Sequence, residues 1–242
     1  MKTILISLLI TLATLSSQAW ELYRFGPTWN WTSEPADYGS GSRFTFPTYD
    51  TSTVGYMVGG VFTTDARYVG DLRGKTVSFR VDLSSSGTSN FVFGGQISVP
   101  PWNTGNIPPS FRLFLTSTEP PFSVAASNGD QLNYWCSQAI DGPMGISLDW
   151  LSSVGTAIVS INVTNTLWTA AHGQRSDGEF ATDFLNCVSR IRQIGIMFGG
   201  GSFFDVGCAV RPNTGAATLT LSNFTVTGSG VVPVGSEDYD GE

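Results

Sequence analysis

The stretch Thr76-Val77-Ser78-Phe79-Arg80-Val81-Asp82-Leu83 alternates polar and apolar side chains without interruption. Successive side chains of a β-strand point to opposite faces, so this period of two predicts a strand with one solvent face and one buried face. A half-buried strand of this kind is typical of antiparallel sheets, which pack one side on a core and leave the other in water.

Seven further segments have strand character, and Gly, Pro, Asn and Ser separate them with the residues that turns favour. They are residues 43–46, 54–62, 91–96, 111–116, 157–163, 192–198 and 217–226. Only residues 177–188 read as a helix: Phe180, Phe184, Cys187 and Val188 share one face, and Asp177 is a plausible cap. Many short strands with one short helix predict an all-β antiparallel sandwich, for which a jelly roll fits best.

The N-terminus has the composition of an export leader. Lys2 precedes a run of about a dozen apolar residues, and Ser17-Gln18-Ala19 supplies the small-x-small ending of a cleavage site. The apolar run is shorter than the roughly 20 residues that a membrane span needs. We therefore expect residues 1–19 to be a cleaved signal peptide, residues 20–227 a single sandwich domain with long loops, and residues 228–242 an acidic disordered tail.

The charge balance excludes some partners. Loss of Lys2 leaves eleven basic residues against nineteen acidic ones, and only 13% of the chain is charged. Binding to nucleic acid or to an anionic membrane needs a basic surface, so we expect neither. A weakly charged surface rich in Ser, Thr, Asn and Gly suits a neutral, hydroxylated partner such as a glycan, and it equally suits other extracellular β-proteins.

The chain has three cysteines and three sequons, and their interpretation depends on the expected extracellular setting. One disulfide is expected in an exported chain, and the pairing favoured is Cys136 with Cys208, because both lie in or beside expected core strands. The spacing itself selects no pair. Asn30, Asn162 and Asn223 each begin an Asn-x-Thr triplet, which is an N-glycosylation site only where the host modifies secreted proteins.

Five segments together resemble a family of bacterial-type secreted domains with a galactose-binding-like jelly roll. They are residues 68–79, 133–137, 168–174, 194–207 and 217–226, which occur in the family's order between about residues 65 and 228. Cys136 stands where the family's aromatic segment has a Trp. The resemblance implies a jelly roll and, through the carbohydrate-binding modules that the family is similar to, a glycan site built from aromatic side chains. Relatives often begin a C-terminal anchoring segment where Val231-Val232-Pro233 lies, but no hydrophobic anchor follows here.

Residues for catalysis are scarce. His172 is the sole histidine, no serine lies in a G-x-S-x-G turn, and no strand carries paired glutamates. The triple glycine at residues 199–201 lacks the Lys and the helix start of a phosphate loop, and it fits a bend at a sheet corner. We expect no enzyme, no zinc site and no cofactor, with a structural calcium ion as a minor possibility.

Aromatic residues are the better functional clue, because Trp and Tyr rings pack on sugar rings while their polar edges hydrogen-bond. Trp150, Phe203 and Phe204 are expected in the core instead. Arg112 interrupts an apolar strand, and the sequence leaves open whether it lines a binding groove or is buried in an ion pair. The candidate ligand-binding residues are Gln96, Trp102, Arg112, Asn133, Tyr134 and Trp135.

These observations favour a secreted, non-catalytic module that binds glycans. A structural or adhesive extracellular protein that contacts another protein is the alternative, and a polysaccharide-degrading enzyme with a sandwich fold is a third. Exposed aromatics would favour the first function, and an exposed apolar patch would favour the second.

Overall fold

The computed structural model describes residues 20–25, 31–49, 57–86, 90–93, 109–117, 131–137, 145–164, 166, 168–170, 174–200, 207–211 and 213–228. The expected leader, the residues Asn30, Gln96, Trp102 and His172, the pair Phe203 and Phe204, and the tail beyond residue 228 lie outside these ranges.

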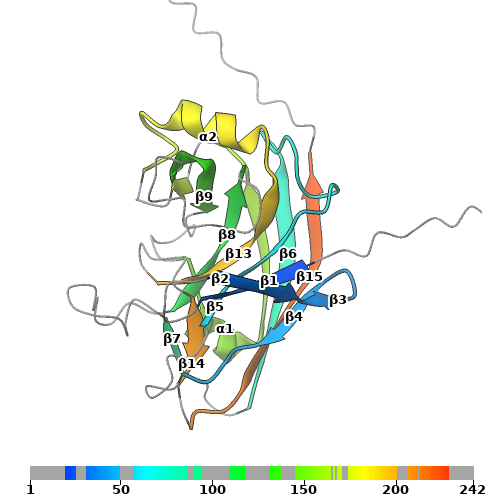
Figure 1. Ribbon diagram of the computed structural model, residues 1–242, viewed down its shortest axis with the longest axis vertical. Helices are drawn as coiled ribbons and strands as arrows, with labels where there is room; N and C mark the ends of the chain where they lie inside the picture. The colour runs from blue at the N-terminus through cyan, green and yellow to red at the C-terminus, as the bar shows by residue number, and fades with distance from the viewer. Residues whose placement is uncertain are drawn as a thin grey trace, which may run out of the picture.

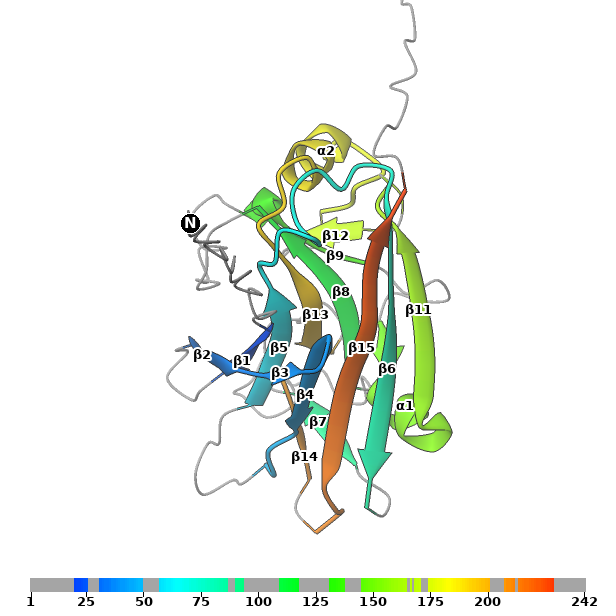
Figure 2. The ribbon, with the colours of Figure 1, turned by 90° about the vertical axis from the view of Figure 1, so that its right-hand side faces the viewer.

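Two antiparallel sheets pack face to face, which confirms the predicted all-β sandwich (Figures 1 and 2). The small sheet has the strand order β11-β6-β15-β4-β3. Its strands are β3 (Asp37–Tyr38), β4 (Gly41–Thr45), β6 (Thr76–Ser85), β11 (Thr156–Asn162) and β15 (Ala217–Thr227).

The large sheet has the order β12-β9-β8-β13-β5-β1-β2, with three short strands attached beside this path. The path strands are β1 (Trp20–Phe25), β2 (Trp31–Pro35), β5 (Met57–Thr63), β8 (Ser110–Thr116), β9 (Tyr134–Ser137), β12 (Trp168–Ala170) and β13 (Gln193–Gly199). The attached strands are β7 (Phe91–Phe93), β10 (Ile146–Ser147) and β14 (Cys208–Val210).

Two α-helices accompany the sheets, so the expectation of a single helix is wrong. The predicted one is α2 (Ala181–Val188), which buries Phe184, Cys187 and Val188 as expected. Asp177 does not cap it, because Phe180 occupies the cap position, and the Asp177 carboxylate pairs with Arg175. The unpredicted helix is α1 (Leu148–Val154), which is only two turns long, and a 3-10 turn, η3 (Gln131–Asn133), precedes β9.

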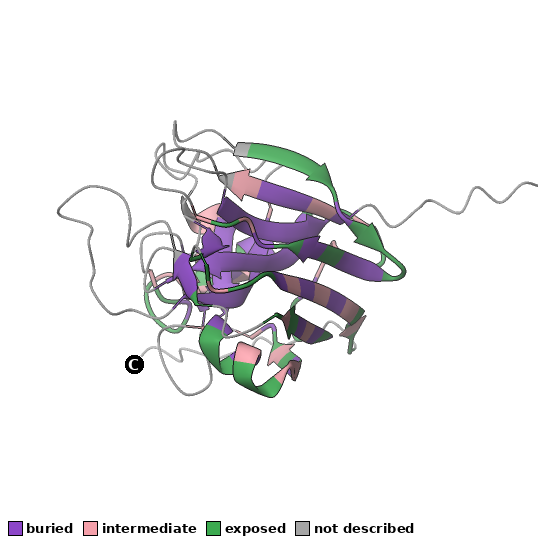
Figure 3. Ribbon diagram, turned by 90° about the horizontal axis from the view of Figure 1, so that it is seen from below, coloured by how far each residue is buried: buried purple, intermediate pink, exposed green. Residues whose placement is uncertain are grey.

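The small sheet alternates as the sequence predicts. Val77, Phe79, Val81 and Leu83 of β6 point into the core, and the residues between them face solvent. Figure 3 shows this alternation as stripes along strands of this sheet, beside strands that are purple along most of their length.

The central strands of the large sheet are buried on both faces. Every residue of β5, β8 and β13 is buried, including Arg112, Thr116 and Gln193. Leu113, Leu115, Ile194 and Ile196 belong to the main core between the sheets. The alternate residues of the same strands lie on the other face and form a separate buried layer, where two of the predicted site residues, Arg112 and Tyr134, are found.

Candidate functional site

The six predicted ligand-binding residues do not gather in one place. Arg112 and Tyr134 come together, on neighbouring strands β8 and β9 and on the face of the large sheet that points away from the main core. Trp135 and Asn133 lie elsewhere, and Gln96 and Trp102 are outside the described residues.

The prediction that Trp135 forms the wall of a ligand groove is wrong. Trp135 pairs with Leu115 across the β8–β9 ladder, and its fully buried ring meets Phe184 edge-on with 5.2 Å between ring centroids. Its Nε1–H donates to the Leu132 carbonyl at 2.8 Å. Consecutive strand residues point to opposite faces, so Tyr134 and Trp135 cannot both face one ligand.

Asn133 holds η3 in place. Its Oδ1 accepts a hydrogen bond from Ser117 Oγ at 2.9 Å, and its carbonyl accepts from the Ser117 N–H at 3.0 Å and from Cys187 Sγ at 3.2 Å. These contacts tie η3 to the end of β8 and to α2, which is a structural role.

Arg112 and Tyr134 belong to a second buried layer, which we call the outer layer. Its apolar members are Tyr23, Phe62, Phe114, Tyr134, Cys136 and Met197. The Tyr23 and Phe62 rings stack with centroids 4.1 Å apart, and the Phe114 and Tyr134 rings are tilted with centroids 5.8 Å apart. The Tyr23 hydroxyl donates to Gln193 Oε1 at 2.9 Å.

The Arg112 guanidinium lies within this layer, with 6% of the residue exposed. Its Nη1 donates to Thr169 Oγ1 at 3.1 Å, and Met197 is its neighbour across the β8–β13 ladder. Burial lowers the pKa of Arg112, because a desolvated cation is disfavoured, while Cys136 and Tyr134 act in the opposite direction. The sequence left two alternatives for Arg112, a position lining a binding groove and burial in an ion pair. The structure shows that Arg112 is buried and that the Thr169 hydroxyl accepts a hydrogen bond from it.

The outer layer combines aromatic rings with an arginine, an amide and hydroxyls, but it is closed to solvent. No apolar member is more than 6% exposed. A ligand therefore cannot reach these side chains in the structure as it stands, and the layer serves to hold the sandwich together.

The predicted disulfide between Cys136 and Cys208 is absent, and all three cysteines are free thiols. Cys136 lies in the outer layer, where its Sγ donates to the Tyr134 hydroxyl at 3.0 Å, whereas Cys208 lies in the main core. The large sheet itself separates the two. Burial raises the pKa of Cys187 to about 11 and also raises that of Cys208, so both remain protonated at neutral pH.

Trp150 on α1 is one of two aromatic residues that are 50% exposed among the described residues, and the other is Tyr38 on β3. Trp20, Trp135 and Trp168, by contrast, are at most 1% exposed, so the expectation that Trp150 packs in the core is wrong. Leu148 and Leu151 anchor α1 in the core. Ser147 caps its first turn by accepting from the Trp150 N–H at 3.2 Å, and Gly155 ends the helix at a positive φ.

Charged groups lie at the start of α1. Partial burial raises the pKa of Asp149, and a hydrogen bond from the Phe91 N–H and the nearby Arg211 oppose the rise. A carboxylate can accept hydrogen bonds from ligand hydroxyls, and a guanidinium can donate hydrogen bonds to them. The helix end therefore presents an exposed indole ring with polar groups on the adjoining elements.

The outer face of the small sheet is hydroxyl-rich and exposed. Across its strands Thr45 bonds Thr218 at 2.9 Å, Ser78 bonds Ser160 at 2.9 Å, and Thr76 donates to Asn162 at 2.8 Å. Its Arg80 forms an ion pair with Asp82 at 2.7 Å, and Asp82 also accepts from Thr156. In Figure 2, α1 lies beside the lower ends of β6 and β11 of this sheet.

Two of the three sequons can be placed. Asn162 and Asn223 are both exposed, and Asn223 has a positive φ of 52° at an irregularity in the β15–β6 register. Among the described residues, no group of three His, Cys, Asp or Glu could hold a metal ion. No helix in the described part of the chain is long and apolar enough to cross a membrane.

No family model, curated protein or solved structure matches the chain. The resemblance to secreted jelly-roll domains therefore stays a prediction.

Proposed function

We propose that the chain is an exported, non-catalytic sandwich module that binds a neutral glycan through Trp150. The carrying observation is the half-exposed indole on a helix whose other face is fixed in the core. Trp is enriched at binding interfaces, because its ring supplies apolar contact area while its indole N–H can hydrogen-bond.

The rigidity of α1 supports the proposal. Capping at Ser147 and Gly155 and the burial of Leu148 and Leu151 fix the backbone beneath Trp150. A preorganised platform loses little conformational entropy when a ligand packs on it, so more of the contact energy appears as affinity.

The weakly charged surface and the export leader complete the proposal. Leader removal would place the module outside the cell, where neutral polysaccharides occur, and the hydroxyl-rich outer face of the small sheet would not repel them. The absence of a catalytic motif in the sequence favours binding without turnover.

A glycan array of neutral oligosaccharides and polysaccharides, probed with the secreted protein, tests this function. We expect binding to at least one neutral glycan, a tenfold or greater loss in Trp150→Ala, and no loss in Val154→Ala, which truncates another half-exposed residue of the same helix. No binding to any glycan would overturn the proposal, and equal binding by both variants would overturn the site.

An adhesive function is the second candidate, and a free strand edge favours it. Gly155 accepts from Leu83 of β6, and Val163 bonds to Gly74 and Lys75 just before β6. With this register the backbone groups of Thr156, Ile158 and Ser160 point away from β6, and no described residue bonds to them. The other edges are protected: β3 has two residues, residues 174–176 pair with β12, and β2 carries Glu34 and Pro35.

The partner that this edge suits is a second copy of the chain. A two-fold axis brings like residues together, and β11 carries no charged residue that would repel itself. Ile158, 79% exposed, would be buried in such a pair. Sedimentation velocity tests this dimer. A dimer would support adhesion if Ile158→Lys dissociates it and Ser84→Lys, a control on the interior strand β6, leaves it intact. A monomer at all concentrations would exclude it.

A further inference from the structure

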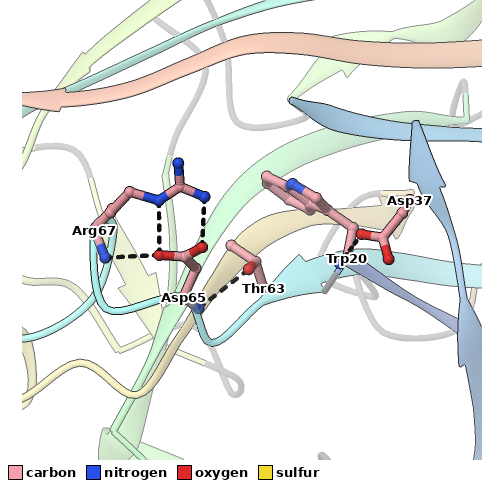
Figure 4. Close-up of polar contacts among 5 residues, drawn as sticks. All are labelled: Trp20, Asp37, Thr63, Asp65 and Arg67. Atoms are coloured by element: carbon pink, nitrogen blue, oxygen red, sulfur yellow. Dashed lines mark hydrogen bonds and ion pairs between the residues drawn. The ribbon is translucent and has the colours of Figure 1, made fainter. Parts of the chain in front are cut away.

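The backbone nitrogen of Trp20 is held by a carboxylate. It donates to Asp37 Oδ1 at 2.6 Å, a short distance typical of hydrogen bonds to a charged group. Figure 4 shows the Asp37 carboxylate turned toward this nitrogen, separate from the Asp65–Arg67 ion pair at the end of β5.

The position of Trp20 is fixed by several contacts besides this one. Its ring is fully buried and meets Phe224 edge-on at a centroid distance of 5.2 Å, and its carbonyl accepts from the Ala36 N–H at 2.8 Å. It also pairs with Thr63 in the β1–β5 ladder. Its nitrogen would therefore stay beside Asp37 whatever is attached to it.

Trp20 is also the residue that directly follows the small-x-small ending Ser17-Gln18-Ala19. Cleavage there hydrolyses the Ala19–Trp20 amide with one water molecule, leaving a carboxylate on Ala19 and an amine on Trp20. The amine takes up a proton at neutral pH, because an α-amino group has a pKa of about 7.7–8.0.

We propose that Trp20 is the first residue of the mature protein and that Asp37 is the counterion of its new ammonium group. Cleavage thus converts an amide hydrogen bond into an ion pair that fastens β1 to β3. The inference rests on the proposed export of the chain, but the ion pair can be tested independently of it.

Asp37 is the charged group placed to act as the counterion of the Trp20 ammonium. The other charged groups on the described elements around Trp20 are mostly paired: Arg24 of β1 forms an ion pair with Glu34 of β2 at 2.7 Å, and Asp65 forms a two-pronged pair with Arg67. Arg43 of β4 lies over the Tyr38 ring at 5.0 Å, and Glu21 of β1 is the remaining carboxylate. Asp37 is the carboxylate in contact with the Trp20 nitrogen.

The pH dependence has a definite sign. Pairing with Asp37 raises the pKa of the folded ammonium above its unfolded value, so the stabilisation is fully present below about pH 7.7. It is lost as the pH rises through the folded pKa.

Intact-mass measurement of the protein secreted by cells that make the full chain gives the first result. A mass that corresponds to a chain beginning at Trp20 supports the assignment. A different N-terminus overturns the assignment, and a retained leader also overturns the proposed export.

The second test is thermal unfolding of a chain that is produced with Trp20 as its first residue. At pH 6.5 we expect a melting temperature about 2–4 °C above that of the same chain with its N-terminus acetylated, as about 1 kcal/mol gives in a domain of this size. The difference should vanish near pH 10 and in Asp37→Asn. An unchanged difference in Asp37→Asn, or none in the wild type, would overturn the ion pair even if export is correct.

Discussion

The hydroxyl of Tyr23 on β1 donates a buried hydrogen bond to Gln193 on β13, 170 residues later in the chain. The bond crosses β5, which lies between these two strands in the large sheet. It therefore ties the N-terminal strand to the middle of the outer layer.

Removal of this hydroxyl should destabilise the fold. We expect Tyr23→Phe to lower the free energy of unfolding by about 1 kcal/mol, the usual cost of one buried hydrogen bond, with an unchanged dependence on urea. Tyr38→Phe, at an exposed tyrosine, is the matched control and should change it little. Equal stabilities for the two variants would contradict a role for the bond.

A glycine in β13 allows two strands to approach closely. A Cβ at Gly195 would collide with the Val61 carbonyl and lie 2.7 Å from the Phe62 Cα. We expect Gly195→Ala to cost about 1–3 kcal/mol of unfolding free energy, as overpacking of a core does. Gly178→Ala, where a Cβ would meet nothing within 4 Å, should be close to neutral, and a similar loss at both sites would contradict the packing.

The three thiols should behave as free and buried groups. We expect the native protein to react slowly with a thiol reagent at pH 8 and to show three reactive thiols once it is unfolded without reductant. The high pKa of Cys187, about 11, is one cause of the slow reaction. A single thiol in the unfolded, unreduced protein would show that a disulfide forms after all.

Asp149 should make stability depend on pH. Because partial burial raises its folded pKa, protonation favours the folded state, and this stabilisation is lost as the pH rises through the folded pKa. We expect Asp149→Asn to gain melting temperature relative to the wild type as the pH rises from 3 to 7. A constant difference across that range would contradict the raised pKa.

Strands that are half exposed were predictable from the sequence, and the sides of fully buried strands were not. The alternation in β6 and β15 locates both strands and their faces, because one side is wet. In β8, both sides of the strand are buried, so the polar residue Arg112 indicated an outward position without showing that another layer covers it.

Face assignment depends on long-range pairing that no local pattern contains. Tyr134 and Trp135 look alike as adjacent aromatics, yet their register with β8 sends one to the outer layer and the other to the core. The same uncertainty produced the wrong disulfide between Cys136 and Cys208. The helix α1 was missed because two turns are too short to show periodicity, although the cap residues Ser147 and Gly155 were a usable signal.

The central claim is that Trp150 contacts a neutral glycan, and nuclear magnetic resonance tests it most directly. The indole N–H signal of Trp150, assigned by its disappearance in Trp150→Phe, should shift when a glycan identified on the array is titrated into labelled protein. The indole signals of the buried residues Trp20, Trp135 and Trp168 should stay in place. Glycan binding that leaves the Trp150 signal unmoved would contradict the claim.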